Sequence, residues 1–199
     1  MKITLVGDSV FDNAAYLAPG ELDTAGRLRE AVPGDKCVML AVDGSVTEGV
    51  IASQLPRVPR DTDAVFVSTG GNDALAHADL LYEGVATDTL ERLYRAQAVF
   101  ADVYREMLTT LSRLNKPFAV FTVYSGNFPD QHVQRAATAA ISVFNDVIYR
   151  ICNEFMVPVI EMRDICNSTA DYANEIEPSS EGSRKIAGAM AAWLRDRMP

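Results

Sequence analysis

The sequence predicts an α/β fold: a five-stranded parallel sheet with helices on both faces, giving three layers. Two observations predict it. Short apolar segments rich in β-branched residues alternate with longer amphipathic segments through the whole chain, and this alternation is typical of parallel sheets covered on both sides. No repeat, low-complexity run or linker interrupts the 199 residues. We therefore expect a single domain over residues 1–199.

The five expected strands share a short, mostly apolar composition, which is typical of strands buried on both faces. They are predicted at residues 2–6, 37–42, 64–68, 117–123 and 157–160. Glycine or proline lies close to several of their ends and favours turns there.

Between the strands, five segments have a helical composition or apolar residues spaced by three and four. They are predicted at residues 21–31, 46–55, about 87–114, 131–155 and 178 to about 197. Ser45 or Asp43 caps the second helix, and Pro178 suits the first position of the last. In the third helix we expect one stripe to pack in the core: Leu90, Leu93, Tyr94, Ala98, Ala101, Tyr104, Leu108 and Leu111.

The charge of the chain argues against two classes of partner. Its formal net charge is -9 and its sequence pI is about 4.7, whereas nucleic acids and anionic membrane surfaces attract basic patches. No apolar run reaches the length of a membrane span and no leader precedes the first strand, so we expect a cytoplasmic protein with no membrane span. The oligomeric state is not predicted.

The cysteines and histidines do not suggest a metal site. Cys37, Cys152 and Cys166 lack a Cys-x-x-Cys spacing and are expected to be small buried thiols. His77 and His132, the two histidines, form no cluster with metal-ligand spacing. We expect no metal ion and no cofactor.

The segment Gly7-Asp8-Ser9 follows the first strand at its carboxyl end, where open α/β sheets place their ligands. Gly7 allows a sharp turn there. A serine at this position presents its hydroxyl at the rim of a rigid sheet, so Ser9 is a candidate nucleophile. The alternative is that Ser9 only caps a helix.

Two further strand exits carry small polar loops, Asp43-Gly44-Ser45 and Gly70-Gly71-Asn72-Asp73. In a parallel sheet these exits lie at one edge, so the three loops should converge. Acyl transfer needs a nucleophile and hydrogen-bond donors placed where an oxyanion forms. Ser9 supplies the nucleophile, and the donors are the backbone N–H groups of Ser9 and Gly44 and the side-chain amide of Asn72.

These blocks resemble the GDSL, or SGNH, hydrolase family over essentially the whole chain. Gly7-Asp8-Ser9-Val10 is similar to the block with the nucleophilic serine, with valine in place of the usual leucine. Gly44 resembles the oxyanion glycine, and Gly70-Gly71-Asn72-Asp73 resembles the block whose asparagine completes the oxyanion hole. The resemblance implies a flavodoxin-like α/β/α sandwich and activity on esters, since most members are esterases, lipases or related acylhydrolases.

The last block departs from the family pattern. The family usually carries Asp-x-x-His-Pro before the final helix, and this chain has Asn174, Glu177 and Pro178 at the corresponding positions. The family's histidine is its general base, so the resemblance places Glu177 in that role. A glutamate with its ordinary pKa near 4.3 is a weaker base toward a serine hydroxyl than a histidine near 6.5.

Three interpretations of Glu177 stay open. It is a working base whose pKa is raised by burial or by Asp8 or Glu175. Alternatively, His77 or His132 has taken over the task from another loop. In the third interpretation Glu177 is only a carboxylate at a helix N-terminus, and the protein binds without catalysis.

Several other polar or aromatic residues lie on loops at the same edge, and each either supports or lines the site or simply forms its turn. Asp8 orients a loop or caps a helix, and Asp73 is expected to anchor its own turn. The remaining candidates are Asn13, Tyr124, Asn127, Phe128 and Glu175.

The predicted function is hydrolysis of a small-molecule carboxylic ester through an acyl-Ser9 intermediate. Ser9 and Glu177 are the expected catalytic residues, and Ser9, Gly44 and Asn72 the expected oxyanion hole. Two alternatives remain: a non-catalytic binding protein, and an acyltransferase on the same fold.

Overall fold

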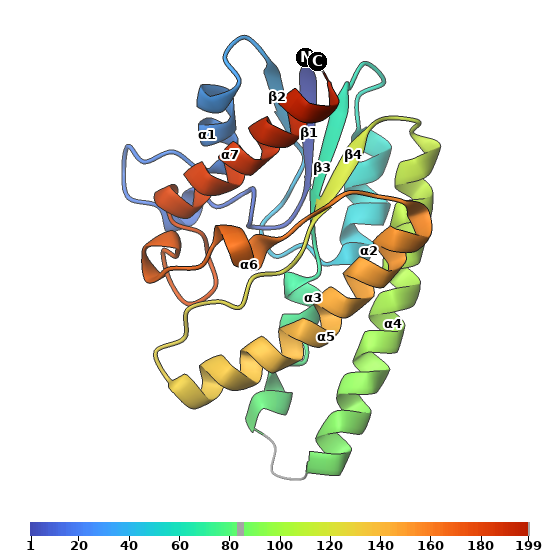
Figure 1. Cartoon of the computed structure of the whole chain (residues 1–199), viewed down its shortest axis with the longest axis vertical. Coiled ribbons are helices and arrows are strands. Elements are labelled where there is room, and N and C mark those ends of the chain that lie inside the picture. The colour runs from blue at the N-terminus through green and yellow to red at the C-terminus, as the bar shows by residue number, and fades with distance from the viewer. Residues whose placement is uncertain (83–85, 199) are drawn as a thin grey trace.

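The computed structural model describes residues 1–82 and 86–198. A parallel sheet of five strands lies at its centre, in the order β2-β1-β3-β4-β5 (Figure 1). The strands are β1 (Lys2–Gly7), β2 (Lys36–Met39), β3 (Ala64–Ser68), β4 (Phe118–Phe121) and β5 (Val159–Ile160). The predicted α/β fold with a five-stranded parallel sheet is confirmed.

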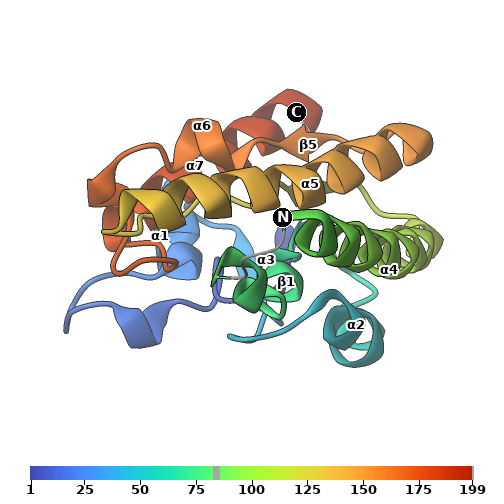
Figure 2. The same cartoon turned by 90° about the horizontal axis from the view of Figure 1, so that it is seen from below.

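Helices form a layer on each face of this sheet (Figure 2). α1 (Thr24–Ala31) and α7 (Ser180–Arg197) pack together on one face, and α4 (Ala86–Arg113) and α5 (Gln131–Phe155) pack together on the other. Three short helices lie in connections: α2 (Thr47–Gly49), α3 (Gly71–Leu75) and α6 (Met162–Ile165).

Alternate residues of each strand pack in two separate hydrophobic cores, because successive side chains on a strand point to opposite faces of the sheet. Phe66 of β3 packs with α1 and α7, in a core with Ile3 and Leu5. Its neighbours Val65 and Val67 pack in the second core with α4 and α5. Both faces of the central strands are therefore buried, which explains their nearly continuous apolar sequence.

The long helices α4 and α5 extend past the carboxyl ends of the strands (Figure 1). Where α4 faces the sheet, Tyr104, Leu108 and Leu111 are fully buried, as predicted. In its first turns Leu90 and Tyr94 are each 65% exposed, because this part of the helix has no sheet beneath it. The expectation that the whole stripe packs in the core is therefore wrong at these two residues and at Ala98, which is also exposed.

Three helix boundaries differ from the prediction for local reasons. α1 begins at Thr24, three residues later than expected, because Asp23 is its N-cap and accepts a hydrogen bond from the Gly26 N–H. The helix expected over residues 46–55 is α2, with Val46 at its N-cap position and no side-chain cap, so the expectation that Ser45 or Asp43 caps it is wrong. A π-helical turn (Val50–Gln54) and a 3₁₀ turn (Leu55–Arg57) that contains a proline follow. The last helix begins after Pro178, because Ser179 is its N-cap and accepts a hydrogen bond from the Gly182 N–H.

The three cysteines are free thiols; Cys152 and Cys166 are buried as predicted, and Cys37 is half-buried.

Candidate active site

The turn after β1 is fixed by two features of Gly7. Gly7 has φ +138°, and a Cβ atom there would lie 1.8 Å from the Ser68 carbonyl oxygen. The Gln54 side chain accepts a hydrogen bond from the Gly7 N–H (2.7 Å) and donates one to the Gly7 carbonyl (2.8 Å). The chain therefore leaves β1 in a single direction, and Ser9 lies two residues after Gly7. The sequence analysis did not identify Gln54, because its hydrogen bonds to Gly7 join two segments 47 residues apart and become evident only in the folded structure.

Ser9 lies against Glu177, which is 168 positions later in the chain. The Ser9 Oγ donates a hydrogen bond of 3.1 Å to the Glu177 Oε1, and both side chains are buried. The two residues that the sequence analysis made nucleophile and base are thus in direct contact.

The loop that carries Glu177 is held by its own polar groups. The Asn174 Oδ1 accepts hydrogen bonds from the backbone N–H groups of Ile176 and Glu177, both 2.9 Å. The Tyr124 hydroxyl donates to the Ile176 carbonyl (2.5 Å). Asn174 therefore orients the backbone around Glu177, which is a different task from orienting an imidazole.

Asn13 joins the serine loop to the glutamate loop. Its amide nitrogen donates to the Pro178 carbonyl (2.9 Å) and to the Ser183 Oγ (2.8 Å), and its Oδ1 accepts from the Thr24 N–H (3.1 Å). The side chain is fully buried. Asn13 thus ties the loop that follows Ser9 to Pro178, the residue after Glu177, and does not line the cavity.

Glu177 has an unusual electrostatic environment for a carboxyl group. Burial raises its pKa from the ordinary 4.5 to about 7, the Ser9 hydrogen bond lowers it, and the negative charge of Asp43 raises it further. Its second oxygen, Oε2, is buried and has no hydrogen-bond partner among the described residues. Near neutral pH the group therefore takes up or releases a proton readily.

Asp8 is a second buried carboxyl group beside Ser9. Burial raises its pKa to about 7, the Val10 N–H and Ser68 Oγ bonds lower it, and the charge of Glu177 raises it. The Val10 N–H bond to its Oδ1 is 3.2 Å long. Asp8 therefore fixes its own turn and does not cap a helix, which was the alternative considered.

The Asn72 amide reaches the same site from α3. Its Nδ2 donates to the Ser45 carbonyl (3.0 Å), and the second hydrogen of an amide NH₂ remains to be donated. This bond also connects the Asp43-Gly44-Ser45 turn to α3. The backbone N–H groups of Ser9 and Gly44 make no hydrogen bond to the described residues.

Three of the candidate supporting residues lie away from the reacting groups. Asp73 accepts hydrogen bonds from the Thr47 N–H and Oγ1, both 3.0 Å with its Oδ2, and also from its own backbone N–H, so it anchors the neighbouring turn together with its own. The Asn127 N–H donates to the Glu175 carbonyl (2.7 Å), which joins two exit loops. Among the described residues, the cavity at Ser9 is not lined by Asp73, Asn127, Glu175 or Gly44.

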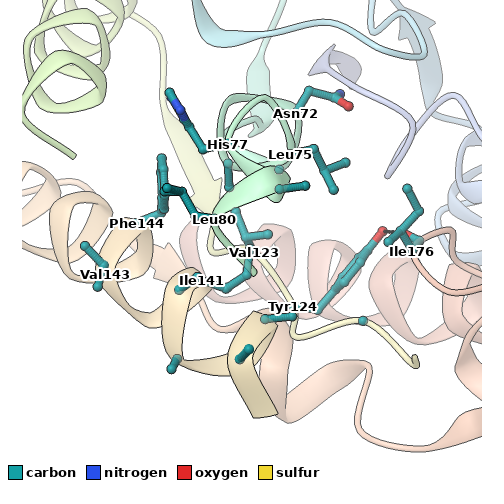
Figure 3. A pocket seen from close by; sticks show the side chains of 18 of the residues that line it. Asn72, Leu75, His77, Leu80, Val123, Tyr124, Ile141, Val143, Phe144 and Ile176 are labelled. Carbon is teal, nitrogen blue, oxygen red and sulfur yellow. Dashed lines mark hydrogen bonds between the residues drawn. The ribbon is translucent and has the colours of Figure 1, made fainter. Parts of the chain in front are cut away.

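A cavity of about 370 Å³ opens beside Ser9 (Figure 3). Its polar end holds Asp8, Ser9, Asn72 and Glu177. The rest lies between α5 on one side and α3, the segment after it and the first turns of α4 on the other, and its walls are mostly apolar. The sequence analysis did not predict this space, because it depends on how far α4 and α5 stand apart.

The two histidines differ in position. His77 is half-buried and lines the far part of the cavity. His132 is exposed on α5, where a ring nitrogen lies 3.3 Å from Arg135, and it does not line the cavity. Glu177, and neither histidine, is the hydrogen-bond acceptor of Ser9.

Within residues 1–82 and 86–198, no group of three or more His, Cys, Asp or Glu side chains is arranged to hold a metal ion. No helix in the same part of the chain is long and apolar enough to cross a membrane.

Solved structures similar to this chain are named lipases and esterases. They include the lipase Lip_vut3 from a goat rumen metagenome (TM-score 0.73, 18% identity, 96% of each chain covered). Phospholipase A1 from Streptomyces albidoflavus NA297 has a TM-score of 0.70 at 15% identity, with 98% of each chain covered. The acetyl xylan esterase AlAXEase also has a TM-score of 0.70 at 15% identity, over 98% of this chain and 100% of that one. At these identities the likeness concerns the fold.

No curated protein matches the chain closely enough to count as a relative. The model of the GDSL-like Lipase/Acylhydrolase family matches residues 5–185, which include Ser9, Gly44, Asn72 and Glu177. Since this match spans most of the chain, the protein belongs to the GDSL-like lipase/acylhydrolase family.

Proposed function

We propose that the protein hydrolyses small-molecule carboxylic esters with Ser9 as nucleophile and Glu177 as general base. The observation that carries the proposal is the 3.1 Å hydrogen bond from the Ser9 Oγ to the Glu177 Oε1 at the polar end of a cavity. A nucleophile in hydrogen-bond contact with a base is the arrangement that activates a serine. Because the pKa of Glu177 is raised to about 7, this carboxylate is matched to neutral pH nearly as a histidine is.

The reaction proceeds in two halves. The Ser9 Oγ attacks the acyl carbon while its proton passes to Glu177, and the carbonyl π electrons move to oxygen. The tetrahedral intermediate then collapses, the bond to the alcohol breaks, and Glu177 returns the proton to the departing alkoxide. In the second half a water attacks the acyl-Ser9 ester, Glu177 accepts and returns the proton, and the carboxylic acid leaves.

The negative oxygen of the intermediate needs donors. We assign this task to the backbone N–H groups of Ser9 and Gly44 and to the free amide hydrogen of Asn72. The support for it is that the two N–H groups have no partner among the described residues and that Ser45 holds the Asn72 amide from its other hydrogen. Donors held in this way need little reorganisation when charge develops.

The test compares Ser9→Ala with the parent on p-nitrophenyl esters. We expect the variant to lose at least about 10³-fold in kcat, since removing a nucleophile leaves only binding and oxyanion stabilisation. The matched control is Ser53→Ala, an exposed serine in the π-helical turn, which should keep the parent activity. A fluorophosphonate probe should label Ser9 in the parent and in Ser53→Ala.

Equal activity of Ser9→Ala and the parent would exclude this mechanism. An inactive, unlabelled parent that gains activity in the double variant Glu177→His/Asn174→Asp would instead identify a binding protein that lacks its base. Formation of a new ester when an added alcohol competes with water would identify an acyltransferase.

A further inference from the structure

The cavity at Ser9 continues well beyond the groups that the proposed chemistry uses. From its polar end it passes between α5 on one side and the segment that follows β3 together with the first turns of α4 on the other. We call this part the apolar arm. Its walls are Leu75, Leu80 and Leu93 on one side and Ala140, Ile141 and Phe144 of α5 on the other.

The arm owes its width to small side chains on one helix. Ala136, Ala137, Ala139 and Ala140 of α5 all line the cavity. Leucine at any of these positions would be equally compatible with a helix, and it would fill space that is now open. An open apolar space forfeits dispersion contacts along its walls, so it is best occupied by an apolar group of a ligand.

The place of Glu177 indicates which part of an ester enters the arm. Glu177 must protonate the departing alcohol, so the alcohol lies on the Glu177 side of Ser9. Figure 3 shows Ile176, the neighbour of Glu177, at one side of the pocket, and Val143 and Phe144 at the opposite side. The acyl chain therefore extends away from Glu177, into the arm.

We propose that the apolar arm binds the acyl chain of the substrate and that the alanines of α5 set its length. The proposal rests on the hydrolase function proposed above and adds the substrate class: esters of medium-chain fatty acids, of roughly six to ten carbons for a cavity at the small end of ligand pockets. The similar structures carry names from acetyl xylan esterase to phospholipase A1, so likeness does not choose a chain length.

The first experiment measures kcat/KM for p-nitrophenyl esters from acetate to dodecanoate. Each methylene that enters the arm should raise kcat/KM about 4-fold, mainly through KM, until the arm is full. Ala140→Leu and Ala136→Leu should lower the decanoate-to-acetate ratio by at least about tenfold. The matched control, Ala98→Leu, makes the same change on the exposed face of α4 outside the cavity and should keep the parent ratio.

A second measurement does not need activity. Ser9→Ala is titrated with octanamide and with acetamide by calorimetry; neutral amides are used because a free carboxylate would be repelled by Asp8 and Glu177. Octanamide should bind and acetamide should not, and adding Ala140→Leu should weaken octanamide binding.

The outcomes separate the two proposals. A flat chain-length series with Ser9 labelled by the fluorophosphonate probe overturns the acyl arm and leaves the hydrolase intact. Octanamide binding that Ala140→Leu weakens, in a protein that hydrolyses no ester, supports the arm and overturns the hydrolase. Equal effects of Ala140→Leu and Ala98→Leu on the ratio overturn the arm.

Discussion

At the scale of single residues, the proposed chemistry depends most on the protonation state of Glu177. A carboxylate beside a serine hydroxyl is a poor base at its ordinary pKa. Burial and the nearby charge of Asp43 raise that pKa to about 7, and a base works best when its pKa is near the operating pH. Burial thus gives this glutamate a pKa near neutral pH, which an imidazole ring has without any shift.

The pH dependence of kcat/KM follows from this shift. Only the ionised Glu177 can accept the Ser9 proton, so kcat/KM for a neutral ester should rise with pH through about 7 and level off above it. Substituting Asp43→Asn removes a charge that raises the pKa and should move the rise to lower pH, whereas Asp146→Asn on the exposed face of α5 should not. Full activity already at pH 5 would contradict a base with this pKa.

At the scale of secondary-structure elements, the position of Glu177 depends on where α7 starts. Gly182, in the first turn of α7, packs on the backbone of Asp171, and a Cβ atom there would lie 2.2 Å from the Asp171 carbonyl oxygen. The Ser179 N–H donates a 2.9 Å hydrogen bond to the same oxygen. The start of the helix is therefore pressed against the loop that precedes Glu177.

Gly182→Ala should destabilise the protein by about 1–3 kcal/mol, because an added methyl group must push α7 and Asp171 apart, and it should lower kcat by moving Glu177. Gly188→Ala is the matched control in the same helix, because nothing lies within 4 Å of its Cβ position; it should gain up to about 1 kcal/mol from helix propensity. Chemical denaturation measures both. Equal stability of the two variants would show that α7 and Asp171 can move apart to admit the methyl group at Gly182 without a cost in folding free energy.

The elements that sequence could predict are those whose ends are set locally. The helix at 131–155 is found at Gln131–Phe155, since Asp130 caps it and Met156 ends it in a left-handed conformation. The last helix was placed two residues early, because Pro178 and Ser179 both suit a helix start and only the Ser179 bond to Gly182 decides between them.

The site was predictable to the extent that it follows from the sheet. Parallel strands bring their carboxyl ends together, so Ser9 and Asn72 were expected at one edge, and both line the same cavity. The links made by Gln54 and Asn13 were not predicted, since each joins segments far apart in the chain. The apolar arm was not predicted either, because no local sequence pattern determines the distance between two packed helices.

At the scale of the whole molecule, the buried carboxyl groups of the site work against stability. In the unfolded chain Glu177 has its ordinary pKa of 4.5, and in the folded protein the pKa is about 7. Folding therefore favours the protonated form. The corresponding stability is fully present below pH about 4.5, and it is lost as the pH rises through about 7.

Glu177→Gln, which cannot ionise, should thus exceed the parent in free energy of unfolding at pH 8 by up to about 3 kcal/mol, at about 1.4 kcal/mol per pKa unit. The gain should shrink toward zero below pH 4.5. Urea denaturation at pH 4.5 and pH 8 measures this, with the exposed Glu106→Gln as the control that should stay near the parent at both pH values. A gain that is the same at both pH values would show that the pKa of Glu177 is not raised by folding.

The chain starts and finishes at the same end of the molecule. β1 begins and α7 finishes at the amino-terminal ends of the strands, on the edge opposite to Ser9 (Figure 1). An affinity tag, a fused partner or a solid support attached through either end would lie on the side of the molecule opposite to Ser9, and the cavity would stay accessible to solvent. Short linkers are enough for such attachments, since nothing has to be carried around the sheet.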